Sequence, residues 1–201
     1  MSRPEAEQLD YGELKTAVAA WIKRADLTSV IPTFIALAES DITNDVRCRA
    51  MELRAGITLA GETQPHPDGL IEVRQLVIGG EEYEYVTPQV YEANTDARRR
   101  IFTSVGQSFL INGGASGDVG TLVYRAGFAA LAQDADTNWL LTNHPEVYLW
   151  AALRHACIYT LDDAGRASYA QLYAGAVERL NRREAMNSHS GPMRLRAENM
   201  E

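Results

Sequence analysis

Apolar residues recur every three or four positions over two stretches near the start of the chain. In the first stretch, Leu14, Val18 and Ile22 fall on one side of a helix that begins at Asp10. Asp10 and Glu13 have the spacing of a capping box, with Asp in the place of Ser or Thr. The second stretch carries an apolar stripe made of Ile31, Ile35, Ala38, Ile42 and Val46. The pattern therefore predicts two helices before residue 50.

From residue 51 to about residue 127 the pattern alternates over short segments, which favours strands. Gly79 and Gly80 fit a two-residue hairpin turn, because glycine adopts the positive φ that such turns need. The alternation slips by one residue near Arg74 and Gln75, which predicts a β-bulge. The segment 61–69 holds two prolines and two glycines and is predicted to be a loop. Further strands are expected at 52–59, 101–105, 108–112 and 121–126, with a short helical turn at 88–93.

The last third of the chain returns to a helical pattern. Pro145 opens a helix through Leu161 that is apolar on nearly every side, and such a helix belongs at the centre of a helical assembly. Asp162 and Asp163 end that helix and cap the next one, which is expected over 164–187. Residues 188–201 are polar and are predicted to form an extended C-terminal arm that a partner orders.

The order of helices, strands and helices indicates an α+β fold that is mainly α. We predict an antiparallel-packed helical bundle made of residues 10–50 and 137–187. A small antiparallel β domain, residues 51–127, is inserted between its halves. The bundle and the insertion together form one domain over 9–187, which the arm follows.

Charge and composition narrow the class of protein. The 201 residues carry a formal charge of −8, which argues against a nucleic-acid coat because such coats bind phosphates through basic residues. Cys48 and Cys157 lie among apolar neighbours and are expected to be buried free thiols. The polar start of the chain predicts no signal peptide, and the longest apolar run, 147–161, is too short to cross a bilayer.

Two loops contain fragments of motifs that bind phosphate or calcium. The segment 113–120 is rich in glycine, but no lysine follows and a strand comes next, so a flexible hairpin loop is favoured over a phosphate site. Ser116 lacks the flanking glycines of a nucleophile elbow. The segment 134–138 copies the first positions of a calcium loop, but Trp139 and Pro145 stand where Gly and Glu are required. We therefore expect no metal and no cofactor.

An enzyme is the weakest of the functional hypotheses. A small hydrolase would have to use Asp136, His144 and Asp162, which show no triad spacing. His144 and His155 are about 16 Å apart along a helix at 1.5 Å per residue, so one metal ion cannot bind both. Capping and structural roles are favoured for these residues, and no catalytic residue is predicted.

Two clusters are candidates for contacts with other molecules. Arg98, Arg99 and Arg100 form the one basic cluster, and a solvated strand edge is favoured over a phosphate or acidic-partner site. Three aromatic residues gather near the start of the apolar helix, namely Trp139, Tyr148 and Trp150. Core packing and a subunit interface both explain them, because Trp and Tyr are enriched at interfaces, and this alternative stays open.

Several segments resemble a known family. They are LKTAVAAW at 14–21, IPTFIALAE at 31–39, TNWLLTNHPEVYLWAAL at 137–153, Leu172-Tyr173 with the helix after them, and SGPMRLR at 190–196. Together they span most of the chain, and their pattern is similar to that of the head-to-tail adaptors, or connectors, of tailed bacteriophages.

The resemblance implies a structural virion protein without an active site. It implies a ring, typically of twelve copies, that lies beneath the portal, extends the DNA channel and provides a platform for downstream tail or nozzle proteins. DNA would pass through the lumen without sequence-specific binding, and assembly would take place in the host cytoplasm without a membrane. The arm would contact the portal, with the interface candidates Pro192, Met193, Arg194, Leu195 and Arg196. Another neck or tail-completion (stopper) protein is the alternative.

Overall fold

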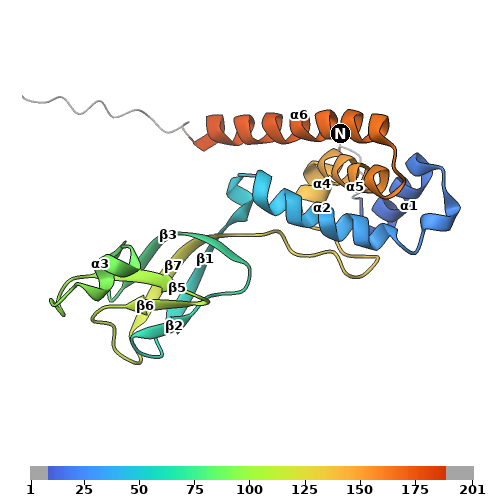
Figure 1. The fold of residues 1–201 in the computed structure, drawn as a ribbon. Coiled ribbons are helices and arrows are strands. Elements are labelled where there is room, and N and C mark those ends of the chain that lie inside the picture. The colour runs from blue at the N-terminus through green and yellow to red at the C-terminus, as the bar shows by residue number, and fades with distance from the viewer. Residues whose placement is uncertain (1–8, 189–201) are drawn as a thin grey trace, which may run out of the picture. The chain divides into compact units, whose positions relative to one another are not determined.

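The computed structural model describes residues 9–188, and the chain divides into two compact units. The helical unit comprises the chain up to Arg49 and from Phe128 onward, whereas the sheet unit is Ala50–Gly127. Figure 1 shows the long helices in the first unit and the strands in the second. The sequence of the sheet unit thus interrupts that of the helical unit.

One helix lies at the centre of the helical unit. This helix, α5 (Pro145–Tyr159), packs against the other helices of the unit and buries residues on several of its sides, as the sequence predicted. The surrounding helices are α1 (Tyr11–Ile22), α2 (Ile31–Asp45), α4 (Trp139–Asn143) and α6 (Asp163–Ser188). Two 3₁₀ turns, η1 (Ala25–Leu27) and η2 (Arg49–Met51), follow α1 and α2. Helices from both ends of the sequence therefore share one core.

Local sequence signals set the helix ends. The Asp10 carboxylate accepts the Glu13 backbone N–H at 2.8 Å, and the Glu13 carboxylate accepts the Asp10 N–H at 3.1 Å, which confirms the capping box. Asn138 caps α4 by accepting the N–H of Leu141 at 3.0 Å. Cys48 and Cys157 are buried thiols, as expected.

The sheet unit contains seven strands within residues 50–127. In spatial order they run β1-β7-β3-β4-β5-β6-β2. The turn at Gly79 and Gly80 has φ of 60° and 84° and joins β3 to β4, and the register of β3 shifts between Val73 and Gln75, so the predicted hairpin and bulge are both confirmed. The strands are β1 (Glu52–Thr58), β2 (Thr63–Pro65), β3 (Leu70–Ile78), β4 (Glu81–Tyr85), β5 (Ile101–Val105), β6 (Ser108–Ile111) and β7 (Val119–Ala126).

The core of the sheet unit lies on the inner face of the sheet. Leu76, Phe102, Phe109, Ile111 and Leu122 are at most 2% exposed there. The short helix α3 (Pro88–Glu92) links β4 to β5 and packs against β5. This link allows β4 and β5 to run parallel, which a tight turn could not do.

The predicted fold class is wrong, although the protein is α+β. A helical bundle with a small antiparallel insertion was expected, whereas the structure has a curled, seven-stranded mixed sheet that forms a half-barrel with its own core. One strand, β2, lies in the segment 61–69 that was predicted to be a loop, and it pairs with β6. The position of a strand follows from local alternation, but its pairing partners and its direction in the sheet depend on residues far apart in the chain. For this reason the sequence predicted a smaller, purely antiparallel sheet.

Candidate interaction surfaces

The three aromatic interface candidates occupy three different environments. Tyr148 is 1% exposed, and its hydroxyl accepts a hydrogen bond from the Asn138 side-chain amide at 2.8 Å. Burial raises the pKa of Tyr148 well above its ordinary value. Trp139 is 37% exposed and stacks on Phe128, with ring centroids 6.2 Å apart. Of these, Trp139 presents surface to solvent, whereas Tyr148 is part of the core.

The third aromatic candidate, Trp150, belongs to a cluster of rings from three helices. Trp150 of α5 meets Trp21 of α1 edge-on at 5.0 Å and stacks on Tyr169 of α6 at 6.0 Å. Trp21 itself is 49% exposed. This cluster joins three helices, which shows the packing role, and it leaves part of its surface uncovered, so the interface role stays a prediction.

A polar network that sequence reasoning missed joins α2 to α5 and α6. The Asp41 carboxylate of α2 accepts hydrogen bonds from Arg154 and, at 2.6 Å, from His155. One turn later, the Asp45 carboxylate accepts the hydroxyl of Tyr173 at 3.0 Å. The sequence held two signals of this network. Asp41 and Asp45 are four residues apart on α2, and the basic residues Arg154 and His155 interrupt the apolar run of α5.

The same network continues toward the sequence that leaves the helical unit. Asn181 of α6 accepts the N–H of Arg47 at 2.7 Å and donates to the carbonyl of Asp45 at 2.9 Å. The Glu184 carboxylate accepts the N–H of Arg49 at 3.0 Å. These contacts satisfy backbone groups just beyond the end of α2, where the helix leaves them without intrahelical partners. The second half of α6 is thus fixed to the segment 46–49.

The basic cluster at 98–100 is used within the sheet unit. Arg100 pairs with Glu81, and its guanidinium lies over the ring of Tyr83 with 5.8 Å to the ring centroid. The Arg99 guanidinium lies 3.5 Å from the carboxylate of Glu84. Two of the three arginines therefore contact acidic residues of β4 at the start of β5, which is not an edge strand because β4 and β6 flank it.

The structure gives each residue of the hydrolase hypothesis a local partner. The Asp136 carboxylate accepts the N–H groups of Ala132 and Gln133 at 2.8 and 2.7 Å. These hydrogen bonds hold the pKa of Asp136 below its usual value. His144 faces Glu146 at 3.4 Å, and Asp162 accepts the N–H of Gly165 at 2.9 Å. Within residues 9–188, no hydrogen bond or ion pair joins these three side chains to one another.

The calcium-like segment and the glycine-rich loop are also held by contacts of their own. Asp134 pairs with Lys15 at 2.5 Å, and within the described part of the chain no three His, Cys, Asp or Glu side chains converge as metal ligands would. In the glycine-rich loop, the Asp118 carboxylate accepts the N–H of Ala115 at 2.9 Å. This loop is not a hairpin, because β6 and β7 are not neighbours in the sheet. The hairpin prediction was therefore wrong.

The remaining interface candidates, Pro192, Met193, Arg194, Leu195 and Arg196, lie outside the described residues. Between residues 9 and 188, no helix combines the length and the apolar character needed to span a membrane.

A comparison with protein families finds a match over most of the chain. The family model described as SU10 adaptor protein matches residues 9–196 and so spans both units. No curated protein matches the sequence.

Proposed function

Because the chain belongs to the SU10 adaptor protein family, whose members are structural proteins of phages and not enzymes, we propose that it is a head-to-tail adaptor. In this role it is one subunit of a ring, of twelve copies, that lies beneath the portal in the neck of the virion. The ring extends the DNA channel and provides a platform for downstream tail or nozzle proteins. The observation that carries the proposal is the family match over 9–196.

The construction of the helical unit supports a scaffolding role. Its charged and polar side chains join elements of the protein to one another, as Asp41 does for α2 and α5 and Asn181 does for α6 and the segment 46–49. Such a network makes a rigid body whose outer surface can recognise other proteins. We assign residues 9–187 to the adaptor domain and 188–201 to an arm.

The arm is the proposed contact with the portal. Its sequence places Pro192, Met193 and Leu195 next to Arg194 and Arg196, which combines apolar anchors with positive charge. On the helical unit, the exposed parts of Trp139 and Trp150 are the proposed contacts with neighbouring proteins. Tyr148 supports them from the core, since it is 1% exposed.

The net charge bears on the passage of DNA. A subunit with a formal charge of −8 repels the phosphate backbone, so DNA slides through the lumen without sequence-specific binding. The alternative, another neck or tail-completion (stopper) protein, would use the same scaffold at a different level of the neck. Assembly in the host cytoplasm is part of either proposal.

Imaging the chain bound to purified portal tests the proposal. The full chain should form a closed ring on the portal, and a chain truncated after Ser188 should bind with at least about tenfold lower affinity, as the loss of a few buried anchors implies. A ring attached to the tail completion proteins but not to the portal would favour the stopper alternative. Failure to bind any neck component would contradict both.

A further inference from the structure

The turn between α5 and α6 contains an exposed leucine in a backbone conformation that favours glycine. The N–H of Asp162 donates to the carbonyl of Cys157 at 2.9 Å, and the N–H of Leu161 donates to that of Ile158 at 3.3 Å. These two bonds define a Schellman motif, whose left-handed position is usually glycine. Leu161 occupies it with φ of 58°, and its side chain is 88% exposed. Neither the backbone nor the core of the folded subunit accounts for a leucine here.

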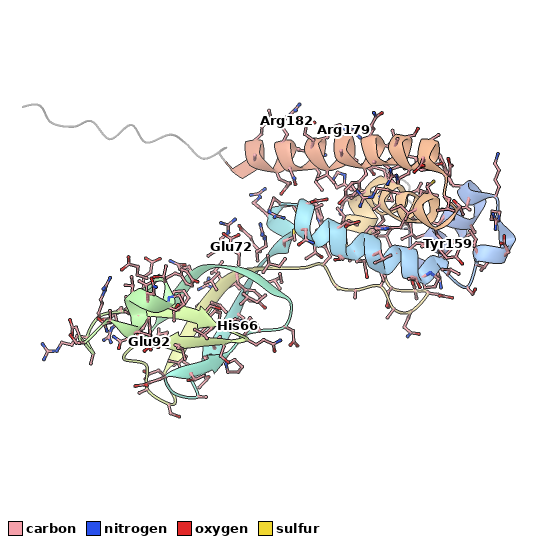
Figure 2. The ribbon with its side chains drawn as sticks, in the orientation of Figure 1. His66, Glu72, Glu92, Tyr159, Arg179 and Arg182 are labelled. Carbon is pink, nitrogen blue, oxygen red and sulfur yellow. The ribbon has the colours of Figure 1, made fainter. Side chains whose placement is uncertain are left out.

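Leu161 is part of a larger apolar area with an acidic rim. Ile158 and Tyr159, at the end of α5, are 49% and 57% exposed. Asp162 and Asp163 follow directly, and the Asp163 carboxylate is 90% exposed although Arg166 lies 3.5 Å away. We call these five residues the corner surface. Figure 2 labels Tyr159 on the helical unit; its ring packs on Phe34 of α2, with ring centroids 5.5 Å apart, and its other side remains exposed.

A second surface of opposite charge follows the side of α6. Leu172, Arg179, Arg183 and Met186 are separated by seven, four and three positions, so they lie on one face of the helix. Leu172 is 46% and Met186 is 69% exposed, and both arginines are exposed. Figure 2 shows Arg179 on the side of α6 that points away from α5. We call these four residues the α6 stripe. It combines apolar anchors with two arginines that form no ion pair with another residue of the described range 9–188.

We infer that the corner surface of one copy of this chain docks on the α6 stripe of a second copy. The inference rests on the proposed ring function, and it names the surfaces that build the ring. Each surface offers apolar side chains, and the aspartates of one complement the arginines of the other. Neither surface complements itself in charge, so each must meet the other surface on a neighbouring copy, and in the proposed ring this contact is made head-to-tail.

The two surfaces lie far enough apart for one copy to contact two neighbours at once. Asp163 and Arg183 are twenty residues apart on one helix, about 30 Å at 1.5 Å per residue. A contact between two different surfaces of identical subunits repeats from copy to copy and closes into a ring when the rotation permits. The straight helix α6 thereby sets the spacing between successive contacts.

Leu161→Gly separates the role of this side chain in assembly from its role in folding. Glycine retains the Schellman geometry and relieves the strained backbone, so the monomer should melt at the same or a higher temperature. Ring formation, measured by native mass spectrometry alone and on portal, should weaken by about tenfold or more, because a buried leucine is lost from the contact. Lys23→Gly is the matched control, because Lys23 also caps a helix at positive φ, 54°, but contributes no leucine.

A charge reversal tests which surfaces meet. Asp163→Arg should weaken ring formation, and combining it with Arg179→Glu and Arg183→Glu in the same chain should restore most of it, because every contact regains complementary charge. Such rescue is not expected of a residue with only a structural role.

The outcomes distinguish this inference from the ring proposal itself. Rings of the original chain that are lost in both Leu161→Gly and Asp163→Arg, and that return when Arg179→Glu and Arg183→Glu are added to Asp163→Arg, support the inference. Rings that form equally well with Leu161→Gly and Asp163→Arg overturn the assignment of surfaces and leave the ring proposal in place. An original chain that stays monomeric, both alone and on portal, overturns both.

Discussion

The helical unit and the sheet unit achieve stability by different means. In the helical unit, α5 contacts α1, α2, α4 and α6, and side-chain hydrogen bonds such as Asp45–Tyr173 connect helices that are far apart in sequence. In the sheet unit, backbone ladders connect strands around one curled inner face. One unit therefore depends on a central element, and the other depends on register.

This difference has consequences for which residues tolerate change. The fold uses the buried Tyr173, Val177 and Leu180 of α6, together with the hydrogen bonds that its second half makes to the segment 46–49. The outer face of α6 has neither role, so its residues can change to suit contacts with other molecules. In a sheet, a one-residue change of register exchanges the two faces of a strand, so most positions along a central strand are constrained. We accordingly place the proposed subunit contacts on the helical unit.

The largest expected effect comes from truncating the core of either unit. Phe102→Ala removes a ring that is 2% exposed and 5.9 Å from the ring of Phe109, and should cost the sheet unit about 3–5 kcal/mol. Leu153→Ala removes a side chain from α5 that is 1% exposed, and should cost the helical unit about 2–5 kcal/mol. Each unit has its own core, so each change should act first on its own unit.

The tryptophans make this comparison measurable. All three, Trp21, Trp139 and Trp150, belong to the helical unit, so urea unfolding followed by tryptophan fluorescence reports on that unit. Hydrogen exchange of the amides of residues 50–127 reports on the other. If Phe102→Ala shifts the fluorescence transition as much as Leu153→Ala does, the two cores are not separate and the comparison fails.

A smaller effect distinguishes a central strand from an edge strand. A Cβ on Gly120 of β7 would lie 2.4 Å from the carbonyl oxygen of Val77, so Gly120→Ala must displace a neighbouring strand and should cost about 1–3 kcal/mol. The matched control is Gly56→Ala in the edge strand β1, where a Cβ would meet no atom within 4 Å. Circular-dichroism melting should place Gly56→Ala at or above the original protein. Equal losses in both variants would show that strand propensity, and not close approach, decides the outcome.

These residues also show how far the sequence alone could lead. The capping box at Asp10 and the hairpin at Gly79 and Gly80 were predicted because all the information lies within a few residues. Gly120 gave no local sign that the backbone of β3 approaches it, because β3 precedes it by some forty residues in the sequence. Pairing partners, parallel direction and curl are long-range properties, and for that reason the fold class was misjudged while most elements were found.

The candidate surfaces follow the same rule. Trp139 and Trp150 could be proposed as contacts from residue type alone, but only the structure separates them from the buried Tyr148. Leu161 appeared to be the last residue of an apolar helix. Its role as an exposed cap residue depends on where α5 ends, and the helix ends two residues earlier than its apolar pattern.

The smallest expected effect concerns an acidic residue of α2 whose side chain contacts the segment that precedes α4. Glu39 is partly buried, and burial raises its pKa, although the hydrogen bond that it accepts from the N–H of Leu131 at 2.9 Å partly opposes this. Since the pKa of Glu39 is higher in the folded than in the unfolded chain, its contribution to stability is fully present below the unfolded pKa and is lost as pH rises through the folded pKa.

Glu39→Gln keeps an acceptor for Leu131 without the charge. It should therefore be as stable as the original protein at pH 7, or more stable by less than about 1 kcal/mol, and that advantage should shrink at pH 4. Urea unfolding midpoints, detected by tryptophan fluorescence at the two pH values, measure this difference in stability. Glu178→Gln, on the exposed side of α6, is the control. A Glu39→Gln protein that loses more stability at pH 7 than at pH 4 would show that the hydrogen bond to Leu131 outweighs the cost of burying the charge.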